Sequence, residues 1–172
     1  GMTETISHIA LKRLKEENSA YIAVSDVTFQ EDRGRLIINA PHLEINGLKT
    51  NDRVKLINKT SFIWLGRTDF VINSGGIKLQ PEQIEIKLSK IIAPPFFISG
   101  IKDEKLGEKL VLCIEKSISN IELTKVSLNT VLSKYEVPKE IYYFDNFERT
   151  ESEKINRIAT MKNRNNAERK VL

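Results

Sequence analysis

The sequence predicts an α+β protein made of two units, residues 1–66 and residues 67–172. Three observations support this fold class. Hydrophobic residues make up 40% and charged residues 29% of the 172 residues, which is typical of a globular chain that can bury a core. The first unit contains closely spaced strand patterns between turn residues. In the second unit, strand patterns alternate with helix patterns.

The first unit is predicted to consist of antiparallel strands joined by tight turns. A turn that contains Gly34 separates two β-prone runs, and residues 58–60 separate two more, so two hairpins are expected. Pro41 is expected to end the strand before it, because proline has no backbone N–H to donate. Such strands suggest a small barrel or a piece of a sandwich. The predicted strands cover residues 21–24, 26–30, 35–39, 53–57 and 61–65.

The second unit is predicted to be compact, with a small sheet and about three helices. Pro81 opens the first helix at a position where its missing N–H is harmless, and Pro94 ends it. The second helix is predicted over residues 121–134, and the third begins near Ile155, after a loop at 150–154. The apolar helix faces comprise Ile84, Leu88 and Ile91 in the first helix and Leu128, Val131, Leu132 and Tyr135 in the second. The predicted strands cover residues 70–73, 77–79, 96–100, 109–115 and 141–144.

The single cysteine, Cys113, lies in a buried-strand pattern, which predicts a small core side chain rather than a reactive thiol. One cysteine forms no disulfide within a chain, and this fits a reducing cytosol. No apolar run approaches the roughly 18 residues needed to span a membrane, and no signal peptide is recognisable. A cytoplasmic protein with no membrane partner is therefore expected.

The charge pattern argues against a nucleic-acid partner. The net charge is +4, and much of the excess lies in the tail at residues 162–170. Aromatic residues make up only 7% of the chain and none interleaves with this tail, so a solvated helix end is expected there. His8 and His42 have no Cys or His neighbours at ligand spacing, so no structural zinc is expected.

Four short segments together resemble one protein family. Residues 66–85 resemble the Gly-Arg-x-Asp … Pro-x-Glu-Ile-Glu signature of the adenylate-forming superfamily, and residues 150–157 resemble its Thr-x-Ser-Gly-Lys-x-x-Arg motif. Residues 1–5 are similar to its Tyr-Gly-x-Thr-Glu motif, and residues 49–52 resemble Thr-Gly-Asp. Each motif alone is weak, but the four occur in the family's order. Within the family, residues 74–83 look closer to the o-succinylbenzoate–CoA ligase branch than to fatty acyl-CoA synthetases.

The resemblance implies a fold and an activity. Residues 1–66 would be the β-rich C-terminal end of the large adenylation domain, and residues 67–172 the C-terminal lid. Members of the family join a carboxylate to the α-phosphate of ATP and then let the thiol of coenzyme A attack the acyl-adenylate. ATP with Mg²⁺ and coenzyme A are therefore the expected substrates of the complete enzyme, with o-succinylbenzoate and menaquinone biosynthesis favoured. No tightly bound cofactor is expected in this chain.

The resemblance also assigns roles to single residues. Lys154 stands at the position of the family's catalytic lysine, where a flexible cation suits the charge that builds on phosphate during adenylation. Asp52 stands where a carboxylate holds the ribose hydroxyls, and Arg67 where planar donors approach the nucleotide. Without the motifs, the same residues read as a surface lysine, an acidic turn residue and a member of a surface ion pair.

Other assigned residues concern the metal, the hinge and the thiol substrate. Thr3 and Glu4 resemble the pair that meets phosphate and Mg²⁺, a cation that prefers hard oxygen ligands. Asp69 matches the hinge about which the family's lid rotates between the half-reactions. Gly75 and Gly76 fit the loop that lines the pantetheine tunnel for coenzyme A, and they are equally compatible with a simple hairpin turn.

Several positions depart from the family pattern. Phe70 replaces the second Asp, Asn73 a common Lys, and Asn51 the Gly of Thr-Gly-Asp. Glu153 replaces the Gly before the catalytic lysine, a change that could alter the loop backbone and draw Lys154 into a local ion pair. These departures put catalytic proficiency in question.

The sequence contains no glycine-rich phosphate loop, so very weak ATP binding and no turnover are expected from this chain alone. A truncated form, a start misassigned to Met2 or a split gene would account for this, and the expected partner is a missing N-terminal adenylation half. Two alternatives remain open. One is the lid of another aryl or fatty acyl-CoA ligase. The other is a non-catalytic docking module that forms a homodimer through exposed strands.

Overall fold

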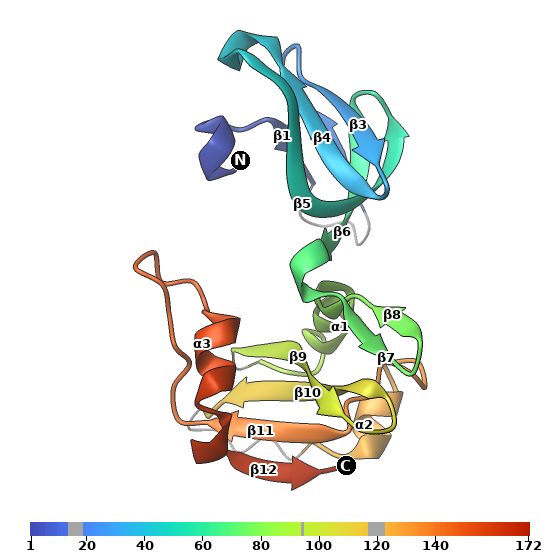
Figure 1. Ribbon diagram of the computed structural model, residues 1–172, viewed down its shortest axis with the longest axis vertical. Coiled ribbons are helices and arrows are strands. Elements are labelled where there is room, and N and C mark those ends of the chain that lie inside the picture. The colour runs from blue at the N-terminus through green and yellow to red at the C-terminus, as the bar shows by residue number, and fades with distance from the viewer. Residues whose placement is uncertain (14–18, 94, 117–122) are drawn as a thin grey trace. The chain divides into compact units, whose positions relative to one another are not determined.

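A computed structural model describes residues 1–13, 19–93, 95–116 and 123–172. The chain divides into unit 1, Gly1–Asp69, and unit 2, Phe70–Leu172, so the boundary lies three residues beyond the division predicted from the sequence. Each unit contains a six-stranded sheet, and the three α-helices of the described residues belong to unit 2 (Figure 1). The predicted α+β class is confirmed.

Unit 1 is an antiparallel sheet with the strand order β1-β2-β6-β5-β4-β3. Short 3₁₀ helices accompany it: η1 (Thr3–Thr5), η2 (Pro41–Leu43) and η3 (Thr68–Phe70), which crosses the unit boundary. The strands are β1 (Ala10–Leu11), β2 (Tyr21–Ala23), β3 (Thr28–Asp32), β4 (Arg35–Ala40), β5 (Ile45–Asn58) and β6 (Ser61–Arg67). The buried core is apolar and comprises Ile9, Ala10, Val27, Phe29, Leu36, Ile38, Ala40, Val54 and Phe62.

Both predicted hairpins of unit 1 form. Arg33 and Gly34 connect β3 to β4 with φ of 53° and 81°, the two positive values that a two-residue type I′ turn requires. Pro41 follows the last residue of β4 and opens η2, as expected. The prediction of a short strand at 53–57 was wrong in extent, because β5 begins at Ile45. Asn46-Gly47 looks like a turn in the sequence, but register shifts between β4 and β5 and the φ of 72° at Gly47 absorb it within the strand.

Unit 2 is a mixed sheet with the order β12-β11-β10-β7-β8, and β9 pairs with β10 outside that path. The β10–β11 pair is parallel and the other pairs are antiparallel. Its strands are β7 (Ile72–Ser74), β8 (Ile77–Leu79), β9 (Phe96–Asp103), β10 (Gly107–Glu115), β11 (Glu140–Phe144) and β12 (Glu168–Val171). Its helices are α1 (Pro81–Leu88), α2 (Lys125–Asn129), α3 (Arg157–Lys162) and the 3₁₀ turn η4 (Arg164–Asn166).

Strand β10 is buried on both faces because side chains alternate along a strand. Leu110, Leu112 and Ile114 belong to the core that α1 and α2 cover. Val111 and Cys113 belong to a second core on the α3 side, where the Cys113 sulfur lies 3.3 Å from that of Met161. Cys113 is fully buried, and burial raises the pKa of its thiol far above the ordinary value. The helices therefore lie on opposite faces of the sheet (Figure 1).

Two helix predictions for unit 2 were wrong in extent. Helix α1 ends at Leu88, before the predicted end at Pro94, which lies outside the described residues. Of the helix predicted over 121–134, the structure contains only α2, Lys125–Asn129. Residues 121–122 also lie outside the described part. A capping box between Thr124 and Ser127 starts α2, and hydroxyl-bearing residues of low helix propensity surround its end. Tyr135, placed on the apolar face, is 60% exposed.

The basic tail is not a solvated helix end as predicted. It forms η4 and then β12, which pairs with β11 through Glu140↔Val171 to Tyr143↔Glu168. The buried carboxylate of Glu140 holds the strand, accepting bonds from Arg169 at 2.5 Å and from Lys109 at 2.7 Å. Strand β12 has only four residues, and its ionic partner Glu140 is distant in sequence, so the local sequence pattern is too weak to predict a strand.

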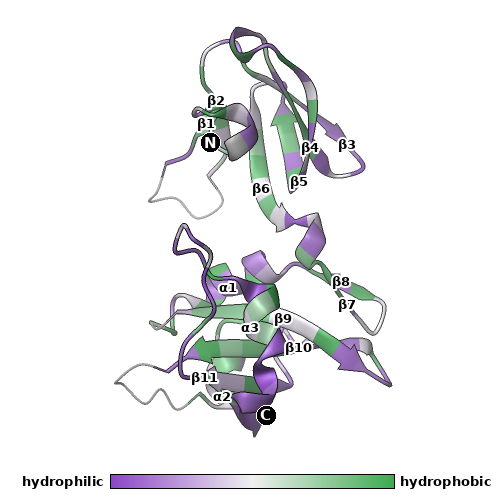
Figure 2. Ribbon diagram, turned by 60° about the vertical axis from the view of Figure 1, so that its left-hand side comes forward, coloured by the Kyte–Doolittle hydropathy of each residue, from purple (hydrophilic) through white to green (hydrophobic). Residues whose placement is uncertain are grey.

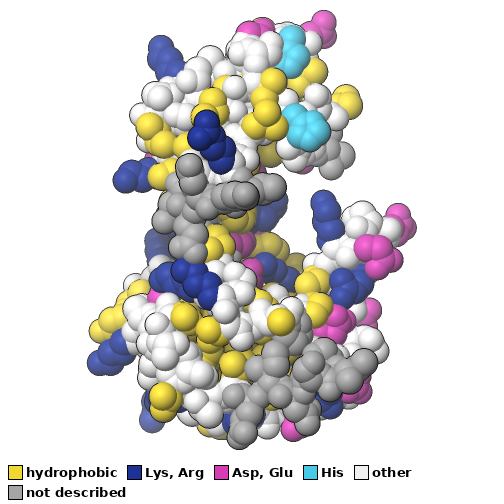
Figure 3. Space-filling model, turned by 180° about the vertical axis from the view of Figure 1, so that it is seen from behind, with side chains coloured by type: hydrophobic (Ala, Val, Ile, Leu, Met, Phe, Trp, Pro, Cys, Tyr) yellow, Lys and Arg dark blue, Asp and Glu magenta, His cyan; other side chains and the backbone are white. Residues whose placement is uncertain are grey.

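The surface of the described residues mixes side-chain types. Figure 3 shows Lys and Arg side chains distributed among hydrophobic and uncharged atoms on the face that it presents. No helix in the described ranges has both the length and the apolar composition needed to cross a bilayer.

Candidate functional site

The predicted site residue Lys154 lies in an exposed loop between β11 and α3. Residues 150–154, named here the Lys154 loop, are closed by hydrogen bonds from the Thr150 N–H to the Lys154 carbonyl, 2.8 Å, and from the Glu153 N–H to the Thr150 carbonyl, 2.9 Å. The Thr150 hydroxyl accepts a bond from the Lys154 N–H, 3.2 Å. An isolated bridge between Arg149 and Ile155 joins the two ends. The segment is hydrophilic in Figure 2, and Lys154 is exposed.

Glu153 takes a conformation that glycine adopts easily. Its φ is +60°, in the left-handed region that residues with a Cβ enter at some energetic cost. A glycine at this position would adopt the same φ without that cost. Within the described residues, no carboxylate pairs with the Lys154 amine, so the expected local ion pair with Glu153 is not observed.

Two arginines bracket the Lys154 loop, and each contacts a carboxylate distant in sequence. Arg149 pairs through Nη2 with Glu115 Oε2 at 2.8 Å, at the end of β10. Arg157, the first residue of α3, pairs through Nη2 with Glu85 Oε2 at 2.7 Å, on α1. Sequence reasoning did not single out these four residues. A signal was available only for Glu85 and Arg157, which end the two longest family motifs.

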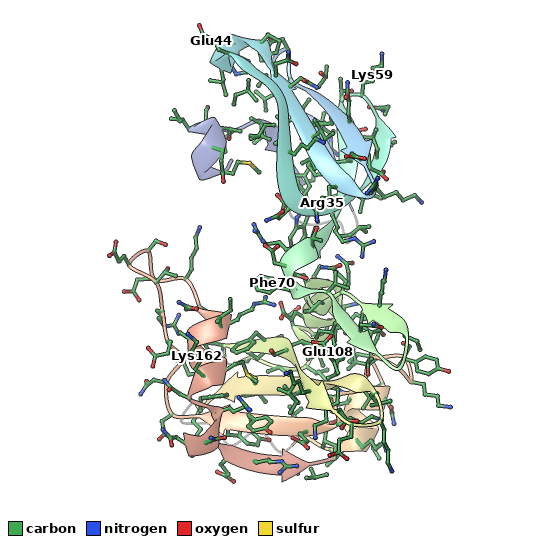
Figure 4. All side chains as sticks on the ribbon, in the orientation of Figure 1. Arg35, Glu44, Lys59, Phe70, Glu108 and Lys162 are labelled. Carbon is green, nitrogen blue, oxygen red and sulfur yellow. The ribbon has the colours of Figure 1, made fainter. Side chains whose placement is uncertain are left out.

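The environment of Glu85 is partly buried. Burial raises the pKa of its carboxyl above the ordinary value, although the charge of Arg157 and a hydrogen bond from the Ile98 N–H oppose that rise. The guanidinium of Arg157 also lies over the ring of Phe70, 4.9 Å from the centroid, and over Phe97 at 5.8 Å. Figure 4 labels Phe70, the first residue of unit 2. The residue in place of the family's second Asp therefore stacks on the arginine beside the Lys154 loop.

Three predicted residues of unit 1 lie together where the C-terminal end of β6 pairs with the middle of β5. Asp52 and Arg67 are direct cross-strand partners on β5 and β6. Arg67 pairs with Asp69 at 2.8 Å, and Asp69 also accepts a bond from Asn51 at 3.3 Å. Asp52 Oδ1 accepts a bond from the indole N–H of Trp64 at 3.1 Å, which fixes the carboxylate. The surface ion pair considered for Arg67 is thus present, next to the carboxylate predicted to hold ribose.

The proposed metal residues lie in η1. Glu4 is exposed, and the structure does not describe the side chain of Thr3. The neighbouring Thr5 is buried, and its hydroxyl is 3.0 Å from the Ser7 carbonyl. Among the side chains that the structure describes, no three acidic, His or Cys groups are close enough together to hold a metal. Glu4 is the right ligand type for Mg²⁺, and further ligands would have to come from outside the described side chains.

Gly75 and Gly76 form the turn between β7 and β8. Their φ values of 59° and 82° suit a two-residue type I′ hairpin, so the simple turn is present. The Gly75 N–H donates to the Leu106 carbonyl at 2.8 Å, and a Cβ at Gly75 would lie 3.3 Å from the Leu106 side chain. Nearby, Glu108 accepts a bond from the Asn73 N–H at 2.8 Å (Figure 4). The role in coenzyme A binding stays a prediction.

The predicted residues thus fall into separate groups. Asp52, Arg67 and Asp69 gather in unit 1, whereas Lys154 and the Gly75-Gly76 turn belong to unit 2 at different positions. Lys154 offers an exposed ammonium group, and Asp52 offers a carboxylate beside the guanidinium of Arg67.

Curated proteins with similar sequences are adenylate-forming ligases. The vibriobactin-specific 2,3-dihydroxybenzoate-AMP ligase of Vibrio cholerae is 33% identical over 115 residues, which is 64% of this chain and 21% of that protein. The 2-succinylbenzoate–CoA ligase of Bacillus subtilis is 32% identical over 111 residues, 63% of this chain and 23% of that protein. The chain therefore spans about a fifth of the length of these relatives. No family model matches the sequence.

Solved structures of similar fold include proteins of the same kind as these curated relatives. An AMP-forming acyl-CoA synthetase-like protein from Dyadobacter fermentans is 33% identical with a TM-score of 0.52, covering 95% of this chain and 49% of that chain. The O-succinylbenzoate coenzyme A synthetase of Bacillus subtilis, in complex with ATP and magnesium ion, is 25% identical with a TM-score of 0.73, covering 94% of this chain and 40% of that chain.

Proposed function

We propose that this chain supplies the lid of an AMP-forming acyl-CoA ligase. The premise is that the chain is similar in sequence and fold to the C-terminal part of adenylate-forming ligases. In this proposal residues 1–66 are the end of the large adenylation domain, residues 67–172 are the lid, and Asp69 marks the hinge. The large remainder of the enzyme is the expected partner, and this chain alone is expected to be inactive.

The observation that carries the proposal is the geometry of the Lys154 loop. A polar loop anchored at both ends presents an exposed lysine whose amine has no carboxylate partner in the described residues. Glu153, at the position where the family motif has glycine, is in the left-handed region, a conformation that suits glycine. An ammonium group so placed is available to an anionic ligand brought by another domain.

The proposed chemistry assigns a distinct task to each group. Lys154 offsets the negative charge where the substrate carboxylate meets the α-phosphate of ATP, and Mg²⁺ bound with ATP neutralises the remaining phosphates. Asp52, held by Trp64, accepts hydrogen bonds from the ribose hydroxyls, and Arg67 donates to nucleotide oxygens. The Gly75-Gly76 turn borders the path of the coenzyme A thiol in the second half-reaction.

An aromatic carboxylate is the favoured acid. Two of the matching curated relatives are 2-succinylbenzoate–CoA ligases, and the third is named for 2,3-dihydroxybenzoate. We propose o-succinylbenzoate and a role in menaquinone biosynthesis. The Vibrio cholerae relative supports a second candidate, an aryl-acid AMP ligase, and a thioester assay with coenzyme A separates the two.

A docking role without catalysis also has support in unit 1. Leu11 and Ile22 are cross-strand partners on β1 and β2, and both side chains are about 60% exposed. Exposed apolar pairs on a sheet suit a partner surface or a second copy of the chain. Light scattering tests this candidate, since a strictly monomeric mass over a wide concentration range argues against self-association.

The decisive experiment combines this chain with a separately produced large-domain fragment of such a ligase and measures pyrophosphate release. Lys154→Ala is expected to lower the rate at least about 100-fold, since a positioned charge at the reacting phosphate contributes several kcal/mol. Lys162→Ala, a change of another exposed lysine in unit 2 (Figure 4), is the matched control and should leave the rate unchanged. Equal rates for the two variants would refute the assignment of Lys154.

A further inference from the structure

The Lys154 loop has few contacts of its own beyond its two ends. Its internal bonds join Thr150 to Ser152, Glu153 and Lys154, all within five residues. Such local bonds set the shape of the loop but not its direction relative to the sheet. The direction has to come from the residues on either side of it.

Arg149 anchors the N-terminal side. Its Nη2 pairs with Glu115 Oε2 at 2.8 Å, and its Nη1 lies 3.4 Å from the carbonyl of Glu153. The same guanidinium therefore contacts both the end of β10 and the residue before Lys154. Glu115 is fixed in turn, because its Oε1 accepts the Phe147 N–H at 2.6 Å and its side chain is only 14% exposed.

Arg157 anchors the C-terminal side in the same manner. It pairs with Glu85, whose other carboxylate oxygen accepts the Ile98 N–H at 2.8 Å. Its Nη1 is buried with no hydrogen-bond partner in the described chain, and the flat guanidinium lies over Phe70. Because Nη1 makes no hydrogen bond, Arg157 is held by its ion pair with Glu85 and by its stacking on Phe70.

We propose that these two arginine–carboxylate pairs position the Lys154 loop, with Arg149, Glu115, Arg157 and Glu85 as positioning residues for Lys154. The inference rests on the proposed function for its catalytic meaning, but the positioning itself can be measured without activity. Each guanidinium contacts a partly buried carboxylate through Nη2, and Arg149 also donates through Nη1 to the Glu153 carbonyl, so its planar fork holds the loop backbone more firmly than a lysine could. A displacement of about 1 Å at a reacting group can lower a rate by about 100-fold, so fixed anchors matter for a lysine on an exposed loop.

Amide hydrogen exchange of the 172-residue chain tests the positioning directly. The informative amides are those of Glu153 and Lys154, which bond to Thr150. Glu115→Gln and Arg149→Gln each remove one member of the N-terminal pair, and we expect exchange at these amides to accelerate about tenfold, because loop opening then meets less resistance. Arg149→Lys keeps the charge but loses the forked donors, so its exchange rate should fall between those of the native chain and Arg149→Gln.

The control is a third ion pair in unit 2, in which a carboxylate likewise accepts bonds from a cationic side chain and from a backbone N–H. Glu136 accepts the Lys87 amine at 2.6 Å and the Ser133 N–H at 2.9 Å, without contact to the Lys154 loop. Glu136→Gln therefore reports the effect of losing a comparable ion pair elsewhere in unit 2, and the loop amides should exchange as in the native chain. The urea midpoint of each variant, measured in parallel, identifies any general loss of stability.

The outcomes distinguish this inference from the proposed function. The positioning would be overturned if loop exchange in Glu115→Gln and Arg149→Gln were no faster than in Glu136→Gln. Additive effects in a variant that combines Glu115→Gln with Arg149→Gln would overturn it too, since partners in one pair must be coupled. If Glu115→Gln or Arg149→Gln unfolds, the exchange rates of the loop amides in Arg149→Lys still test the positioning. In the reconstituted assay these variants should lower kcat with unchanged KM. A null effect of Lys154→Ala there would refute the function while leaving the exchange result standing.

Discussion

Glu153 occupies a backbone conformation that residues with a Cβ rarely adopt. The family pattern has glycine before the lysine, and the sequence alone suggested a distorted loop. In the structure the backbone at Glu153 is left-handed, at φ +60°, which places strain at this residue. A glycine there would adopt the same φ without a Cβ clash.

Glu153→Gly is therefore expected to raise the free energy of unfolding of unit 2 by about 1 kcal/mol, because glycine adopts left-handed φ without a Cβ clash. Urea denaturation followed by circular dichroism measures the change. Glu151→Gly, in the same loop but without a positive φ, is the matched control and should lower the stability by about 0.5–1 kcal/mol. A destabilising Glu153→Gly would show that the conformation is not strained.

At the scale of elements, strand β12 depends on one buried carboxylate. Burial alone would raise the pKa of Glu140, but hydrogen bonds from Lys109, Arg169 and Tyr142 outweigh it and hold the pKa below the ordinary value. A carboxyl with a lowered pKa in the folded state stabilises the protein above its unfolded value near 4.5, and the contribution is lost as pH falls through the folded value.

Glu140→Gln is expected to lower the free energy of unfolding by about 2–3 kcal/mol at pH 7, since it leaves Lys109 and Arg169 without their shared partner. The difference between variant and native chain should shrink as the pH is lowered from 6 to about 3. Urea titrations across that range measure it. Glu168→Gln on β12 serves as the control, because its exposed pair with Lys116 at 3.6 Å contributes little. A pH-independent difference would contradict the electrostatic explanation.

Elements also mark the limit of what the sequence could predict. The hairpins at Gly34 and Gly75-Gly76 were predictable, because glycines in short turns are a local signal. The early end of α2 coincides with hydroxyl-bearing residues of low helix propensity, whose effect is hard to weigh against an apolar face. Strand β12 and the Arg149–Glu115 pair were not predictable, since their partners lie 29 and 34 residues away along the chain. The motif residues were found from resemblance, and their surroundings only from the fold.

At the scale of the whole molecule, the two units have separate hydrophobic cores. No buried residue is shared between the core of unit 1 and the two cores of unit 2 among the described residues. Units that share no core are expected to unfold with different stabilities. The chain carries one probe for each: Trp64, the single tryptophan, in unit 1 and Cys113, the single cysteine, in unit 2.

The unfolding curve from Trp64 fluorescence is therefore expected to differ in midpoint from the curve of Cys113 reactivity toward a thiol reagent. In native buffer Cys113 should react at least about 100-fold more slowly than a free thiol, because it is buried and its pKa is raised. Superimposable curves would indicate that the units unfold as one cooperative body.

The concealment of Cys113 has a practical consequence. The buried thiol of Cys113 is not accessible to maleimide dyes in the folded chain. Cysteines introduced at exposed positions such as Glu44 and Glu104 would therefore be labelled selectively. Two fluorophores placed in this way, one on each unit, form a molecular ruler. Energy transfer between them in single molecules would report changes in the separation of the two units.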